Sequence, residues 1–225
     1  MIAQPRHSKK SVEILFEDSW YLIVNKPAGL VVIPTPHKEE RTLTTLVNQQ
    51  HAYPEKGRLH PCHRLDRDTS GVIVFAYGKK NQKLLMDVFQ GRLVKKKYIA
   101  FVHGKMKKNS GRLEGAIVSY DSMKYHKRPK SKWALSTYTV QRLMKNFSVV
   151  EVDLMTGRTN QIRIQFSQIG HPLLGERKYA FAKDYNLKFR RTALHAHQIS
   201  FRHPVTKKSI EIQAPLSDDM EKLLS

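Results

Sequence analysis

The chain has 225 residues, with 40 Lys or Arg against 19 Asp or Glu, so its formal net charge is +21. Hydrophobic residues make up 40% of the sequence, which is enough for a folded core and excludes a disordered basic tail. A folded protein this basic indicates a polyanionic partner, because each neutralised phosphate releases counterions. A solvated basic surface and a small ribosomal protein without chemistry stay open as alternatives.

The apolar pattern predicts the elements of the first half of the chain after a flexible arm at 1–10. In order, these are strands over 12–16, 21–24 and 30–33, a helix over 42–50 starting at Thr42, a buried strand over 72–76, a helix over 79–91 and a strand over 98–102. Residues 104–132 are rich in Lys, Gly and Ser and predict an exposed basic loop or hairpin.

The second half predicts mainly strands. They lie over 134–142 and 147–154, with a closing hairpin over 197–202 and 208–213 and a short helix in the acidic tail. Residues 159–169 fit either a strand or a helix, and Gly170 followed by His171-Pro172 favours the helix. Many strands in no strict βαβ order indicate an α+β fold, a single domain over 1–225 with a mixed, largely antiparallel sheet and flanking helices.

Cys62 is the only cysteine, which excludes an internal disulfide and a cysteine-only metal site. The N-terminus carries no signal-peptide pattern, and no stretch is apolar enough to span a bilayer. We therefore expect a cytoplasmic protein.

The stretch HRLDRDTSG at 63–71 precedes the predicted buried strand, which is where functional sites are commonly built. Residues 68–70 favour a structural turn. For Asp66, which Arg64 and Arg67 flank, a catalytic carboxylate and a surface ion pair are equally good interpretations of the motif alone.

The stretch TGRTNQIRIQF at 156–166 places Arg158 and Arg163 around the start of the predicted helix. Early helix amides and two arginines favour an anion. Ordinary contacts with an RNA backbone are the competing interpretation, and it fits Arg158 better than Arg163.

Tyr98 follows three lysines at the start of its predicted strand. A strand tyrosine is most often a core residue, whereas an aromatic ring beside basic residues can stack on a flipped base. The residues alone favour the core. The 11 histidines stand mostly apart, and no phosphate-binding or dinucleotide-binding glycine motif is present, so we expect neither a metal nor a cofactor.

Taken together, the motifs resemble the RluA-type family of RNA pseudouridine synthases. The resemblance runs from about residue 12 to residue 216 and is carried by five ordered stretches: ILFEDSWYLIVNKPAGLVV, HRLDRDTSGVIVFA, KKKYIAFVHG, TGRTNQIRIQFSQIGHPLLGERKY and LHAHQISFRHPVTKKSIEIQAPL.

The resemblance implies a sheet with a central active-site cleft and an isomerase that needs no cofactor. It implies that Asp66 is the catalytic carboxylate, that Tyr98 stacks on the target uracil and assists proton removal, and that Arg163 pairs with the carboxylate. Arg64 matches an arginine that fills the gap left by the flipped base. With Arg67 and Arg158, it forms the expected substrate-binding set.

Two positions depart from the family pattern, because Asn160 and Ile33 stand where histidine is usual. We also expect a compact member without an N-terminal RNA-binding extension, acting as a monomer without an obligate protein partner. Its substrate would be ribosomal or transfer RNA. A non-catalytic RNA-binding protein, and a metal-dependent nuclease using Asp66 and Asp68, are the competing hypotheses.

Overall fold

Ten strands hydrogen-bond into one sheet in the part of the chain that is described, residues 11–36, 38–51, 53, 55–119, 130–180 and 187–225 of a computed structural model. The strands are β1 (Glu13–Glu17), β2 (Tyr21–Lys26), β3 (Leu59–Pro61), β4 (Ser70–Tyr77), β5 (Lys95–His103), β6 (Ser110–Ile117), β7 (Lys132–Leu143), β8 (Phe147–Leu154), β9 (Leu194–Arg202) and β10 (Ser209–Gln213). The described helices are α1 (Leu43–Gln50), α2 (Gly78–Gln90), α4 (Gln161–Gln168) and α5 (Asp218–Glu221).

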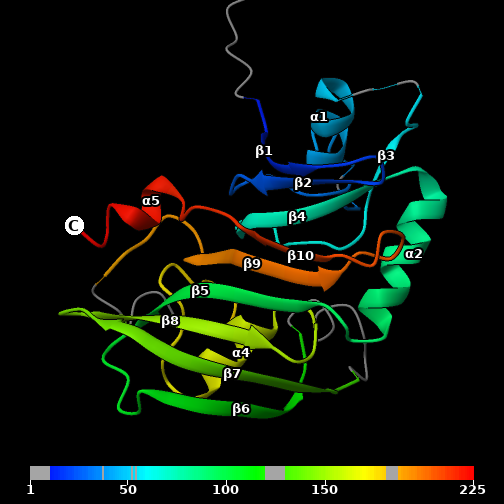
Figure 1. Ribbon diagram of the computed structural model, residues 1–225. Coiled ribbons are helices and arrows are strands. Elements are labelled where there is room, and N and C mark those ends of the chain that lie inside the picture. Colours follow the sequence, from blue (N-terminus) through cyan, green and yellow to red (C-terminus); the bar gives the residue numbers. More distant parts are fainter. Residues whose placement is uncertain (1–10, 37, 52, 54, 120–129, 181–186) are drawn as a thin grey trace, which may run out of the picture.

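The strand order is β1-β2-β4-β9-β5-β8-β7-β6, with β10 paired to β9 and β3 to β4. Among the strand pairs of the described residues, only β4 and β9 run parallel, over the two pairs Ser70↔His195 and Gly71↔Ala196. Figure 1 shows the sheet running from β1 at the top of the view to β6 at the bottom, with α4 behind β7 and β8. The predicted α+β class with a mixed, largely antiparallel sheet is confirmed.

Strand β4 is buried along its whole length because both of its faces pack against apolar side chains. Ile73 and Phe75 join one hydrophobic cluster, and Val72 and Val74 join another on the opposite face. This two-sided burial explains the uninterrupted apolar run in the sequence. It also makes β4 a rigid support for the loop that precedes it.

The predicted helices begin and end near the expected residues. Thr42 caps α1, its hydroxyl accepting a hydrogen bond from the amide of Thr45 at 3.1 Å. Gly91 follows α2 directly. The helical interpretation of 159–169 is confirmed by α4, whose Phe166 packs edge-on against Tyr138 of β7 at a centroid distance of 5.7 Å.

The prediction of a strand over 30–33 was wrong. Residues 30–33 form no strand, because the carbonyls of Val31 and Val32 accept hydrogen bonds from the first amides of α1, at 2.8 and 3.1 Å, and not from a neighbouring strand. The segment 104–132 contains β6, an edge strand that pairs antiparallel with β7, the next strand in the chain, which agrees with the hairpin interpretation of this segment. The arm at 1–10, and residues 120–129 of that segment, lie outside the described residues.

Candidate active site

A cleft of about 1090 Å³ opens where the loop before β4, the start of β5 and the loop before α4 converge. Five of the six sequence-predicted site residues line it: Arg64, Asp66, Tyr98, Arg158 and Arg163. Arg67 is not among the lining residues, and its guanidinium pairs with the carboxylate of Glu39. The fold therefore gathers side chains that are up to about a hundred positions apart in the sequence.

The loop that carries Asp66 is held at four successive backbone carbonyls. The carbonyl of Asp66 accepts from the amide of Thr69 at 3.1 Å, and that of Arg67 from the amide of Gly29 at 2.9 Å. The carbonyl of Asp68 accepts from Nη1 of Arg191 at 2.9 Å. The carbonyl of Thr69 accepts from Nζ of Lys26 at 2.7 Å. A backbone restrained at every step fixes the direction of the Asp66 carboxylate.

Lys26, in the Lys-Pro-Ala-Gly stretch, is completely buried beneath this loop. Its Nζ donates to the carbonyls of Pro27, Arg67 and Thr69 at 2.7–3.0 Å. Burial lowers the pKa of Lys26 to about 7, against the opposing charges of Asp68 and Asp66. Three carbonyl acceptors match the three donors of an ammonium group, so the lysine serves as an internal tie between this stretch and the loop.

Arg191 ties the C-terminal helix to the same loop. Its Nε and Nη2 donate to both oxygens of Asp219 in α5, at 2.7 and 2.8 Å, while Nη1 reaches the carbonyl of Asp68. Close by, Gly71 has a φ of +108°, and a Cβ there would lie 2.2 Å from the carbonyl oxygen of Ala196. Only glycine lets β4 approach β9 this closely.

The carboxylate of Asp66 faces the guanidinium of Arg163, with Nη1 of Arg163 3.5 Å from Oδ2 of Asp66. Its stronger partner is Glu176, whose two carboxylate oxygens accept from Nε and Nη2 at 2.7 Å each. Burial disfavours the charge, but the hydrogen bonds and charge of Glu176, together with Asp66, raise the pKa of Arg163. The arginine is therefore a permanent cation that is oriented by Glu176 and directed at Asp66.

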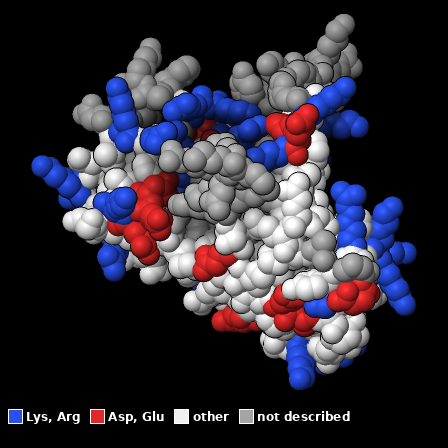
Figure 2. All heavy atoms as spheres, turned by 90° about the horizontal axis from the view of Figure 1, so that it is seen from above, with Lys and Arg blue, Asp and Glu red and all other residues white. Residues whose placement is uncertain are grey.

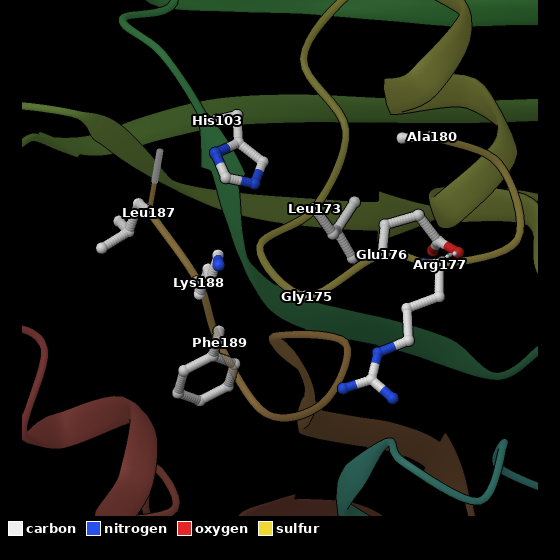
Figure 3. A pocket seen from close by; sticks show the side chains of 9 residues that line it. All are labelled: His103, Leu173, Gly175, Glu176, Arg177, Ala180, Leu187, Lys188 and Phe189. Atoms are coloured by element: carbon white, nitrogen blue, oxygen red, sulfur yellow. Dashed lines mark hydrogen bonds between the residues drawn. The ribbon is translucent and has the colours of Figure 1, made fainter. Parts of the chain in front are cut away.

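Sequence reasoning did not single out Glu176, which is 3% exposed. It follows Gly175, whose φ is +72° and where a Cβ would lie 1.9 Å from the carbonyl oxygen of Arg191. Burial opposes the charge of Glu176, but the hydrogen bond and charge of Arg163, together with the backbone amides of Lys178 and Arg177, lower its pKa. The available sequence signal for Glu176 was that an acidic residue stands between an apolar pair and the basic run Arg177-Lys178. Figure 3 shows Glu176 and Arg177 beside a second, smaller cavity of about 140 Å³.

Asn160 occupies the N-cap position of α4 in the left-handed conformation, with a φ of +56°, which asparagine tolerates better than most residues. Its Oδ1 accepts from Nη1 of Arg163 at 3.2 Å, and its Nδ2 donates to the hydroxyl of Tyr179 at 2.8 Å. The departure from histidine at this position therefore lies directly beside Arg163.

Tyr98 lies in β5 between Val152 of β8 and Ala196 of β9, and it is 8% exposed. Burial and the nearby charge of Asp66 raise its pKa far above the usual value. The side chain is thus a neutral phenol that belongs to the core cluster and also lines the cleft. The core interpretation of Tyr98 is confirmed, and stacking on a flipped base stays a prediction with which its place in the cleft lining is compatible.

The cleft is strongly cationic. Its lining contains seven basic side chains, Arg64, Arg92, Lys95, Lys96, Lys97, Arg158 and Arg163, against Asp66 and Asp153. Figure 2 shows the molecule from above, with Lys and Arg side chains around the outline of the view and Asp and Glu in separate clusters. Such a charge distribution attracts a polyanion into the cleft.

His63 and His195 support the site as neutral groups. Nε2 of His63 accepts from the amide of Val74 at 3.1 Å, and Nδ1 of His195 lies 2.9 Å from the hydroxyl of Ser70. Burial, with the charge of Lys96, lowers the pKa of His63 to about 3. Burial also lowers the pKa of His195 to about 4, against the carbonyl of Ala214.

Because these two histidines are neutral in the folded protein, we expect the protein to lose stability in acid. Below about pH 6.5 both histidines are protonated in the unfolded chain, whereas in the folded chain His195 stays neutral down to about pH 4 and His63 down to about pH 3. Stability therefore decreases as the pH falls, by up to ~1.4 kcal/mol per pH unit for each histidine. Chemical unfolding at pH 7 and pH 5 measures this. His63→Gln keeps an acceptor for Val74 and is expected to reduce the acid loss. An unchanged slope in His63→Gln would contradict the assignment.

Among the described residues, no three His, Cys, Asp or Glu side chains are grouped so that they could hold a metal ion. None of the described helices is both long enough and apolar enough to cross a membrane.

The fold is similar to that of solved pseudouridylate synthases. Human RNA pseudouridylate synthase domain containing 4 superposes with a TM-score of 0.75 at 24% sequence identity, over 94% of this chain and 93% of that one. Human RNA pseudouridylate synthase domain containing 1 gives a TM-score of 0.76 at 22% identity, over 94% and 86% of the two chains. At these identities the similarity defines the fold class, that of pseudouridine synthases.

The sequence relatives define the family. A family model described as RNA pseudouridylate synthase matches residues 20–168. The uncharacterized RNA pseudouridine synthase YhcT of Bacillus subtilis is 34% identical over 94% of this chain and 71% of its own length. Ribosomal large subunit pseudouridine synthase D of Zymomonas mobilis is 33% identical over 99% and 75%. The chain belongs to the RluA-type RNA pseudouridine synthases, which are isomerases.

Proposed function

We propose that this enzyme converts a uridine of a structured RNA to pseudouridine with Asp66 as the catalytic carboxylate, after the uridine has flipped out of its stack into the cleft. The observation that carries the proposal is the pairing of Asp66 with Arg163 in a cationic cleft that Tyr98 also lines. Large-subunit ribosomal RNA is the first candidate substrate, because the Zymomonas relative carries that name.

The reaction rearranges bonds without net oxidation or hydrolysis. The bond between ribose C1′ and uracil N1 breaks, the uracil turns, C5 bonds to C1′, and the proton lost from C5 is balanced by one gained at N1. Asp66 acts on the sugar, as a nucleophile at C1′ or as a base. Arg163 keeps the carboxylate ionised and oriented.

Tyr98 would contribute its ring face and not a phenolate. A raised pKa opposes loss of its proton while Asp66 is charged, so stacking on the flipped uracil is the role that its environment supports. Arg64 is exposed in the cleft lining and would occupy the gap in the RNA stack. Arg158, anchored through Nε to the carbonyl of Trp133 at 2.9 Å, would contact the backbone.

The direct test is incubation of the purified chain with unmodified ribosomal and transfer RNA transcripts in the presence of a chelator. Pseudouridine-specific reverse-transcription stops are expected at one or a few uridines, with the RNA chains intact. Tight, salt-dependent binding with every uridine unchanged would overturn the proposal in favour of a non-catalytic RNA-binding protein.

A further inference from the structure

Three consecutive lysines open β5, and each has different surroundings. Lys95 is exposed. Lys97 donates to Glu151 of β8 with Nζ 2.7 Å from Oε1. Lys96 is half-buried in the cleft wall. The three lysines are identical in the sequence but differ in the structure. The ammonium group of Lys95 is solvated, that of Lys97 is paired and that of Lys96 is enclosed.

The surroundings of Lys96 contain the ring of Phe89 and the backbone of Gly157. Its Nζ lies 6.0 Å from the centroid of Phe89, and a Cβ built on Gly157 would lie 3.4 Å from this nitrogen. Throughout the described residues, no carboxylate lies within salt-bridge distance of Lys96. Burial lowers the pKa of Lys96 without an opposing acidic group. An enclosed cation without an anion is costly.

Lys96 and Tyr98, two positions apart in β5, both line the cleft. β5 pairs with β8 from Lys97 onward, and its pairing with β9, which includes Lys96, shifts register between Lys97 and Tyr98. Two residues of strand separate the Lys96 and Tyr98 positions by ~7 Å. Lys97, between them, also lines the cleft, but its ammonium group is paired with Glu151. A base stacked on Tyr98 and an anion bound by Lys96 would therefore be neighbours in one cleft.

We propose that Lys96 binds a phosphodiester group of the RNA next to the flipped uridine, in a subsite that it shares with the backbone of Gly157 and with Arg158. The proposal rests on the proposed function, since it needs RNA in the cleft. The bound phosphate supplies the anion that the protein itself does not provide, and the missing side chain at Gly157 leaves room for its oxygens.

The test measures the affinity of the full chain for a fluorescein-labelled single-stranded oligouridine between about 50 and 200 mM salt. Lys96→Met is expected to bind about tenfold more weakly and to lower the slope of log affinity against log salt by about 0.7, the value for one phosphate on a single strand. Lys96→Arg is expected to restore both quantities to within about threefold.

Two matched variants remove the same charge elsewhere. Lys80→Met removes an exposed lysine of α2, and Lys208→Met removes an exposed lysine just before β10; neither residue lines the cleft. Both are expected to change the affinity by less than about twofold. Thermal unfolding of Lys96→Met is expected to match or exceed the wild type, because the substitution removes an unpaired buried charge. A merely structural role would instead lower it.

The inference fails if Lys96→Met binds like the wild type, or if all three methionine variants lose affinity equally. It is separable from the proposed function. A wild-type chain that forms pseudouridine while Lys96→Met retains full affinity overturns only the phosphate subsite. A wild-type chain that neither binds RNA nor forms pseudouridine overturns the proposed function.

Discussion

Asp66→Asn is expected to reduce pseudouridine formation at least about 10³-fold while leaving folding and RNA binding intact. The amide keeps the size of the carboxylate but can act neither as a nucleophile at C1′ nor as a base. Nothing in the loop should move, because its carbonyls are held by Lys26, Gly29 and Arg191 through backbone contacts that the substitution does not touch.

The measurement is single-turnover conversion on the RNA identified by reverse transcription, with affinity determined in parallel. Asp68→Asn is the matched control, since it makes the same change two residues away and Asp68 does not line the cleft. Its activity is expected to stay within about threefold of the wild type. Retained activity in Asp66→Asn would remove Asp66 from the chemistry.

Glu176→Gln is expected to lower the free energy of unfolding by about 3 kcal/mol, because it leaves the buried guanidinium of Arg163 facing a neutral amide. It is also expected to slow conversion about 10- to 100-fold, with a smaller effect on RNA affinity, since an unrestrained Arg163 no longer orients Asp66. Chemical unfolding and single-turnover rates measure the two effects.

Glu151→Gln provides the comparison for that substitution. Its partner Lys97 is 37% exposed in its side chain, so breaking this pair is expected to cost less than about 1 kcal/mol. Glu176→Asp, which preserves the charge, should recover part of the rate. If Glu176→Gln and Glu151→Gln unfold alike and turn over at the wild-type rate, Glu176 has no positioning role.

Local pattern was sufficient for most of the fold. The apolar run of β4 follows from the burial of one strand. The cap at Thr42 and the helix end at Gly91 depend on interactions between residues close in sequence. The pattern failed at residues 30–33, because an apolar run fits a strand as well as it fits the irregular segment that the structure has there. There the deciding hydrogen bonds come from the start of α1.

For the candidate site, too, the sequence was sufficient for some residues and not for others. The motifs were sufficient to nominate Asp66, Tyr98 and Arg163, and the fold brings all three to one cleft. They did not select Glu176, because its role depends on a turn at Gly175 that brings its carboxylate back to Arg163 of α4. They also nominated Arg67, whose side chain pairs with Glu39 outside the cleft lining.

The sequence by itself determined the family, the elements and the residue types available for chemistry, since these depend on local spacing and ordered motifs. Only the tertiary structure decided which charge each residue faces. Lys95, Lys96 and Lys97 are identical in sequence terms, yet one is solvated, one is enclosed and one is paired. The physical reason is that burial and ion pairing arise from strands and loops brought together by folding, which no local pattern encodes.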